Sequence, residues 1–186
     1  MSNKTHSIFS GGLLLFTIYF LQSPLSAEAV SREYTIKAGL ILKFTDFIKW
    51  PDGSSNNSEF STYQLCVLGG NRFGNIFSQG KKEGLFKKNI VLKHNMPNQE
   101  LKTCNILFLT GDNQENLRQA LNLLKNEPVL IISESEGYGE LGAGINLVQR
   151  NNKIKFEINR DALQAKGLEV SSRLLNIAIL VGEDLQ

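Results

Sequence analysis

Apolar residues recur along the chain at two kinds of spacing, helical spacing and continuous or alternating runs, which predict helices and strands in alternation. Residues 32–49 carry apolar side chains at helical spacing and are predicted to form a helix with one buried face. Trp50-Pro51 should end this helix, because proline disfavours helical geometry in the residue before it. The apolar residues of the predicted face are Leu40, Ile41, Phe44, Phe47 and Ile48.

Four short apolar runs are rich in strand-forming residues and are predicted to be buried strands. They cover residues 63–68, 89–93, 104–109 and 128–133. Two helices are predicted between them, one over residues 73–78 and one from a cap at Asp112 or Asn113 to about Lys125. The second helix should bury Leu117, Leu121 and Leu124. Strands that alternate with helices in this way indicate a mainly parallel sheet with helices on both faces.

The C-terminal third of the chain has a different pattern of apolar and polar residues. Residues 144–149 and 153–158 flank Asn151-Asn152, and the second of these segments alternates apolar with charged residues. This pattern predicts an antiparallel hairpin with one face in water. The predicted fold class is therefore α/β, with a mainly parallel central sheet, helices on both faces and a C-terminal antiparallel hairpin.

Two further helices are predicted after the hairpin. A short one should open at Asn159 or Arg160 and run to Lys166, with Gly167 as its left-handed stop. Ser171 should cap a final helix that packs its apolar side chains inward. Those side chains are Leu174, Leu175, Ala178 and Val181.

The first 29 residues have the features of a secretory signal peptide. Lys4 gives a positive start, residues 8–21 are almost wholly apolar, and Ala27 and Ala29 form the small-x-small pattern of a cleavage site. A transmembrane anchor needs about 20 apolar residues, and this run is shorter. We expect cleavage near Ala29, with Ala27 as the alternative. Residues 30–186 should then form a single exported domain in the periplasm, not inserted in a membrane.

Composition argues against several functional classes. The formal charge of +2 is near neutral, whereas a nucleic-acid-binding protein usually has an excess of basic residues. The paired lysines at 81–82 and 87–88 fit a solvated loop. His94 is the only histidine after the predicted cleavage site, and no metalloprotease, zinc-cluster or serine-hydrolase motif accompanies it. We therefore predict no catalytic residue, no cofactor and no metal site, and a protein that is not an enzyme.

Four residues are candidates for contact with a partner or a ligand. Glu134 and Glu136 follow a predicted parallel strand, where clefts form in such sheets, although a solvated loop would explain them too. Arg72 lies in the glycine-rich turn of residues 69–74, which fits a tight strand-to-helix turn or, alternatively, an anion site. Tyr138 lies in the glycine-rich segment 136–144 and is expected to be exposed or half-exposed. A hydrolase that uses two loop carboxylates is a further alternative.

The chain has two cysteines, Cys66 and Cys104. An even pair in an oxidising compartment suggests a disulfide. The predicted strands would offset the two sulfurs along the sheet, however, and bonded cysteines need Cα atoms within about 7 Å. Two buried free thiols are therefore the alternative.

Five blocks in this order resemble the YfiR family, whose domain is also called DUF4154, over about residues 34–181. They are residues 37–51 (KAGLILKFTDFIKWP), Cys66-Val67-Leu68-Gly69 with Phe73-Gly74, residues 104–109 (CNILFL), residues 129–133 (VLIIS) leading into 142–148 (GAGINLV), and residues 154–159 (IKFEIN) with Gly167-Leu168 and Leu174-Leu175.

The resemblance implies a non-enzymatic periplasmic regulator. The best-known branch of the family binds the periplasmic part of an inner-membrane diguanylate cyclase and holds it inactive, and an outer-membrane lipoprotein can sequester the regulator. Members form homodimers. The family pattern pairs Cys66 with Cys104, whereas the second cysteine pair of some relatives is missing here. A periplasmic module that binds a small ligand and serves a different membrane client is the alternative function.

Overall fold

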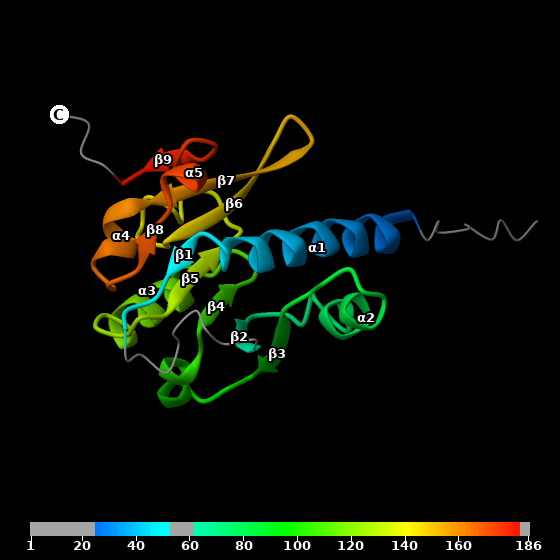
Figure 1. Cartoon of the computed structure of the whole chain (residues 1–186), viewed down its shortest axis with the longest axis horizontal. Coiled ribbons are helices and arrows are strands. Elements are labelled where there is room, and N and C mark those ends of the chain that lie inside the picture. Colours follow the sequence, from blue (N-terminus) through cyan, green and yellow to red (C-terminus); the bar gives the residue numbers. More distant parts are fainter. Residues whose placement is uncertain (1–24, 53–61, 183–186) are drawn as a thin grey trace, which may run out of the picture.

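The computed structural model describes residues 25–52 and 62–182. A seven-stranded sheet with the order β3-β2-β4-β5-β6-β7-β9 forms its centre (Figure 1). Every neighbouring pair in this sheet is parallel except β6 and β7. This confirms the predicted α/β class with its mainly parallel sheet and C-terminal hairpin. The strands of the sheet are β2 (Thr62–Leu68), β3 (Asn89–His94), β4 (Ile106–Leu109), β5 (Leu130–Ser133), β6 (Ile145–Arg150), β7 (Lys153–Asn159) and β9 (Ile179–Val181).

Helices cover both faces of the sheet, and each face has its own apolar core. On one face, α1 (Leu25–Phe44) and α2 (Ile76–Lys82) pack with the C-terminal helices α4 (Arg160–Gln164) and α5 (Ser172–Leu175). On the other face, α3 (Gln114–Leu123) packs with the 3-10 helix η1 (Asn98–Thr103). The sheet is covered on both sides because β4 and β5 are apolar except for Ser133, and all four residues of each strand are buried.

The predicted helix over residues 32–49 is wrong at its C-terminal end. Helix α1 stops at Phe44, and β1 (Ile48–Lys49) follows and pairs antiparallel with β8 (Glu169–Val170). The apolar spacing continues past Phe44, but backbone pairing with the distant β8 favours an extended chain there. The predicted face is nevertheless inward, with Ile41, Phe44 and Ile48 fully buried and Leu40 and Phe47 partly buried.

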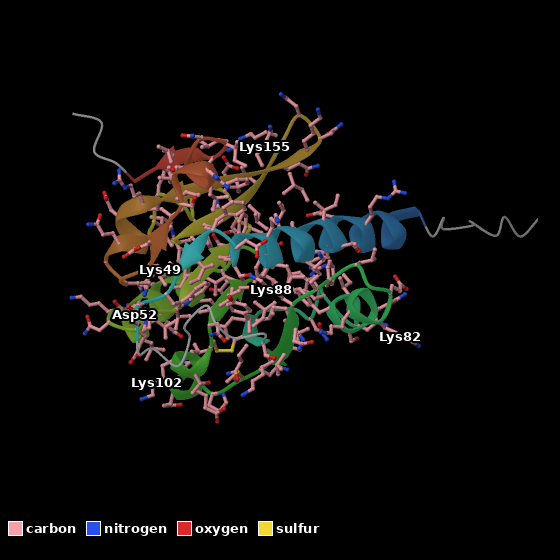
Figure 2. All side chains as sticks on the ribbon, in the orientation of Figure 1. Lys49, Asp52, Lys82, Lys88, Lys102 and Lys155 are labelled. Carbon is pink, nitrogen blue, oxygen red and sulfur yellow. A yellow bond between two sulfur atoms is a disulfide. The ribbon has the colours of Figure 1, made fainter. Side chains whose placement is uncertain are left out.

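The predicted disulfide between Cys66 and Cys104 is present, and Figure 2 shows its sulfur–sulfur bond. Cys104 does not begin a strand as predicted, because it caps η1 and β4 starts two residues later. This position removes the offset that strand pairing would have imposed. The Cα atoms lie 5.9 Å apart, within the range that a disulfide requires.

Side-chain caps and left-handed residues end several elements as the sequence predicts. The Asn113 side chain accepts a hydrogen bond from the Asn116 N–H at the start of α3, and Asn159 accepts one from the Ala162 N–H at the start of α4. Gly167 follows α4 with φ +69°. In the hairpin turn, Asn151 and Asn152 have φ 51° and 57°, the left-handed geometry of the tight turns that join antiparallel strands.

The long final helix that the sequence predicts is also wrong. Ser171 does cap a helix, but α5 ends at Leu175, and β9 then joins the sheet parallel to β7. Leu174 is buried, while Leu175 and Ala178 pack partly against the core. Three apolar residues at 179–181 suit a sheet edge as well as a helix, and β7 offers unpaired backbone groups beside them.

The predicted signal peptide lies mostly outside the described residues. Residues 25–29 form the start of α1, and the description does not extend to the segment before them. None of the helices in the described parts of the chain is long and apolar enough to cross a membrane.

Candidate functional site

A cleft of about 440 Å³ opens at the carboxyl ends of the central parallel strands. The loops that follow β2, β4 and β5 form its floor, and the middle of α1 forms one wall. Such positions are where α/β sheets commonly bind ligands. Its lining residues are Glu33, Tyr34, Lys37, Arg72, Gly111, Asp112, Glu134, Ser135 and Glu136.

Glu134 is the centre of the cleft and joins α1 to the sheet. Its carboxylate accepts hydrogen bonds from the Tyr34 hydroxyl at 2.6 Å and the Lys37 ammonium at 2.6 Å. The Gly111 N–H, in the loop after β4, donates to the same carboxylate at 3.3 Å. The side chains of Glu134 and Lys37 are each only 8% exposed, so this ion pair is shielded from water.

The α1 side of this cluster follows from helical spacing. Residues three and four apart lie on one helix face, which places Glu33, Tyr34 and Lys37 together. The Glu33 carboxylate pairs with Lys37 at 2.5 Å, and the Lys37 ammonium lies 4.7 Å from the centre of the Tyr34 ring. Burial and the hydrogen bond to Glu134 raise the pKa of Tyr34 well above its usual value, so its hydroxyl stays protonated and remains a donor.

The glycine-rich turn after β2 forms another side of the cleft. Gly69 has φ +105°, and a Cβ atom there would clash with the side chain and carbonyl of Thr110. Arg72 stands exposed on this turn and makes no ion pair with any described residue. The Asn71 side chain accepts the Gly74 N–H at 3.0 Å, so that amide is already used within the turn. The turn therefore has the tight strand-to-helix geometry that the sequence favours.

A buried polar network fixes the loop of residues 134–144 beneath the cleft. Asn146 of β6 donates to the Ser135 carbonyl at 2.9 Å and to Glu157 of β7 at 2.8 Å. Its side-chain oxygen accepts from Ser133 at 2.7 Å. Asn159 donates to the Gly139 carbonyl at 2.9 Å and thereby holds the far part of the same loop. The loop is therefore positioned by side chains of the hairpin strands.

Three of the four predicted contact residues meet at the cleft, namely Arg72, Glu134 and Glu136. Glu136 is 73% exposed and forms a two-bond pair with Arg150, at 2.6 and 2.9 Å. The hydrogen bonds from Arg150 lower the pKa of Glu136.

The predicted exposure of Tyr138 is wrong. Its side chain is buried, at 3% exposure, and its hydroxyl donates to Asp112 at 2.9 Å. The glycines around it let the loop turn back, and the Ala143 N–H reaches the Tyr138 carbonyl at 3.0 Å. Burial and the hydrogen bond to Asp112 raise the pKa of Tyr138 to about 12.

Sequence reasoning missed the contribution of α1 to the cleft. Tyr34 and Lys37 lie in the predicted helix, but nothing in their spacing identifies a partner 97 or more residues away. One signal was available, because Lys37 lies next to the buried Ala38 and is itself buried against the protein interior. A lysine on the buried face of a helix needs an anionic partner.

The cleft is suited to binding. Both carboxylate oxygens of Glu134 accept hydrogen bonds, and both oxygens of Glu136 accept from Arg150. The exposed Arg72 guanidinium, which makes no ion pair with a described residue, is therefore the cation most open to a bound molecule. Across residues 25–52 and 62–182, no three histidine, cysteine, aspartate or glutamate side chains gather to hold a metal ion.

One solved structure shares the fold of this chain. A conserved-domain protein from Vibrio cholerae O1 biovar eltor matches 79% of this chain and 59% of its own, with 10% identity and a TM-score of 0.50. An ABC domain from Streptococcus pneumoniae, solved in complex with L-Trp, matches 64% of this chain and 55% of its own, with 11% identity and a TM-score of 0.45. The chain thus spans less than two thirds of either structure.

The family comparison covers nearly the whole described domain. The family model described as YfiR/HmsC-like, DUF4154, matches residues 34–179, from the cleft wall on α1 to the first residue of β9. This protein therefore belongs to the YfiR/HmsC-like family.

Proposed function

We propose that this protein is exported, binds the periplasmic part of an inner-membrane diguanylate cyclase and represses it, thereby lowering cyclic di-GMP signalling. Family membership is the observation that carries this proposal, because YfiR/HmsC-like proteins are periplasmic, non-catalytic regulators of cyclic di-GMP signalling. The family match spans residues 34–179, which are most of the residues that the structure describes.

Repression of this kind requires a difference in affinity for two states of the cyclase. A regulator that binds the inactive state more tightly shifts the population toward that state. A shift from almost fully active to almost fully inactive needs about 5.5 kcal/mol of differential binding. A rigid contact surface favours such a difference, because less conformational freedom is lost on binding.

The loop of residues 134–144 supplies a surface with these properties. Tyr138 is anchored beneath it, while Leu141 on the same loop is 48% exposed. Leu141 borders an apolar groove of about 250 Å³ against α3, which Leu117 and Leu121 also line. Leu123 of α3 is a further exposed apolar residue, at 47%. We assign the cyclase contact to this surface around Leu141, with Tyr138 acting as the support of the loop.

Binding of the purified protein to the periplasmic domain of the cyclase tests this assignment. Leu141→Ser should weaken binding at least tenfold, which corresponds to about 1.4 kcal/mol for an interface anchor. Val91→Ser is the matched control, since Val91 is 47% exposed and lies on β3, an edge strand that β2 and β4 separate from β5. Equal affinity of Leu141→Ser and wild type would show that the contact lies elsewhere.

Family resemblance also supports a homodimer and capture by an outer-membrane lipoprotein. Light scattering on the protein recovered from the periplasm tests the first, with a mass of two chains expected. Co-purification with outer-membrane lipoproteins tests the second, and recovery of the protein with none of them would count against capture.

A second function, binding of a small ligand, is favoured by the cleft around Arg72, Glu134 and Glu136. A ligand there would contact α1 and three strand ends at once, and could tune repression through them. A thermal-shift screen of small charged metabolites tests it, because a ligand at 100 times its Kd stabilises by about 2.7 kcal/mol. Stabilisation that disappears in Arg72→Ala would place the ligand in the cleft, and no stabilisation by any metabolite would argue against this function.

A further inference from the structure

A basic surface with an apolar tip lies at the end of α2, apart from the cleft and from the Leu141 surface. Figure 2 places Lys82 at the outer end of α2 and Lys88 between α1 and β3. We call this surface the α2 tip. It consists of Lys81, Lys82, Leu85, Lys87 and Lys88, with Lys43 from α1 beside them.

The backbone turns Leu85 outward. Helix α2 ends at Lys82, Gly84 adopts φ +73°, and the N–H groups of Leu85 and Phe86 both donate to the Gly80 carbonyl, at 2.8 and 3.2 Å. Phe86 packs inward on Gly80 and lies 6.1 Å from the ring of Phe77. Leu85 is left on the outside of this turn and is 66% exposed, so its exposure follows from how Phe86 is anchored.

The lysines of the α2 tip, with Lys43, outnumber the carboxylates near them, which are Asp46 and the exposed Glu83. Asp46 pairs with Lys88 at 2.7 Å and with Lys43 at 3.0 Å. Burial raises the pKa of Asp46, but hydrogen bonds from Lys88 and Lys43 outweigh it and lower that pKa overall. Among the described residues, Lys81, Lys82 and Lys87 make no ion pair. Positive charge is thus concentrated here in a chain whose formal charge is only +2.

A groove of about 410 Å³ lies beside the tip, between α1 and residues 85–88. Three lysines line it, namely Lys43, Lys87 and Lys88, and Leu85 stands at its edge. Asp46 also lines the groove and already pairs with Lys43 and Lys88. An anionic group such as a phosphate would therefore meet mainly the Lys87 ammonium, next to the exposed Leu85 side chain. This combination matches the chemistry of a phospholipid, which carries a phosphate above an apolar chain.

We propose that the α2 tip docks on an anionic phospholipid surface, with Leu85 entering the apolar boundary and the lysines facing the phosphates. Protein–protein interfaces are depleted in lysine, so a surface with this many lysines favours lipid. Basic residues around an exposed apolar group are the usual pattern of binding at a membrane surface. Each lysine near an anionic membrane strengthens binding about fivefold.

Sedimentation of the protein with vesicles tests the proposal. The protein recovered from the periplasm should bind vesicles of phosphatidylglycerol mixed with phosphatidylcholine, and should bind vesicles of phosphatidylcholine alone far more weakly. The double variant Lys81→Gln, Lys82→Gln should lose roughly 25-fold in vesicle affinity, and Leu85→Ser about tenfold. Added salt should weaken binding, since exposed charges are screened.

The double variant Lys102→Gln, Lys155→Gln is the matched control. Both lysines are exposed, and Figure 2 shows them on other parts of the molecule. This variant removes the same charge and should bind as wild type does. Thermal unfolding of every variant should match wild type, because only exposed side chains are changed.

Three results would overturn the proposal. The first is equal binding of wild type to both kinds of vesicle, and the second is an equal loss of vesicle affinity in the control and tip variants. The third is tip variants that bind vesicles normally but bind the cyclase domain poorly. The last would make the α2 tip a protein-docking surface. The vesicles contain no protein, so failure here is distinguishable from failure of the proposed function.

Discussion

Removal of the Glu134 carboxylate should destabilise the protein out of proportion to the size of the side chain. Glu134→Ala deprives Tyr34 of its acceptor and leaves Lys37, whose side chain is 8% exposed, with Glu33 as its remaining charged partner. Removing one member of a buried ion pair usually costs about 3–5 kcal/mol. Glu33 is 43% exposed and compensates in part, so we expect a loss of about 2–3 kcal/mol.

Urea unfolding measures this loss directly. Trp50 is the only tryptophan and is fully buried, so its fluorescence should report unfolding of the domain. With a slope of about 2 kcal/mol per molar urea, the midpoint should fall by about 1–1.5 M. Glu136→Ala is the control, because Glu136 is 73% exposed and its pair with Arg150 should contribute less than about 1 kcal/mol.

A double-mutant cycle isolates the contact. Lys37→Met removes the charge that Glu134 neutralises, so the double variant should be more stable than the sum of the two single losses predicts, by about 1–3 kcal/mol. Glu134→Gln keeps an oxygen that can accept from Tyr34 and should cost less than Glu134→Ala. Additive losses, or a loss in Glu134→Ala no larger than in Glu136→Ala, would refute the view that this ion pair holds α1 to the sheet.

Three further perturbations test other parts of the fold. Replacing Cys66 and Cys104 together by alanine should lower the free energy of unfolding by about 4 kcal/mol in the chain-entropy model, since the bond spans 38 residues; an unchanged urea midpoint would contradict this. Gly69→Ala should cost about 2 kcal/mol or more, because strain and overlap with Thr110 combine, whereas Gly111→Ala, which meets no atom, should cost about 1 kcal/mol. Burial lowers the pKa of His94, so the unfolded chain takes up a proton before the folded protein does as the pH falls below about 6.5, and the free energy of unfolding decreases there. Urea unfolding above and below this pH should show a smaller decrease in the free energy of unfolding for His94→Gln than for wild type. An equal decrease would be evidence that His94 is not the group responsible.

The central strands and part of the cleft could be predicted from the sequence because they depend on local patterns. Continuous apolar runs identify β4 and β5, and the rule that ligands bind at the carboxyl ends of parallel strands pointed to Glu134 and Glu136. Asn113 and Asn159 were recognisable as caps because their side chains act within three residues.

The parts that were missed depend on contacts between distant residues. Strands β1 and β8 have two residues each, and they are extended because they pair across 120 residues of chain. Tyr138 is buried because Asp112 accepts a hydrogen bond from its hydroxyl and because the glycine-rich loop folds back. Lys37 belongs to the cleft because Glu134, which follows β5, pairs with it across 97 residues of chain. Neither spacing nor composition carries that information.

The level of cyclic di-GMP in cells tests the central claim most directly. It should be measured with the gene deleted, with the gene restored, and with a restored copy that lacks residues 1–29. Repression of a cyclase from the periplasm predicts that cyclic di-GMP rises on deletion and returns to its original level only with the complete, exported chain. An unchanged level on deletion, or full restoration by the copy without residues 1–29, would contradict the account.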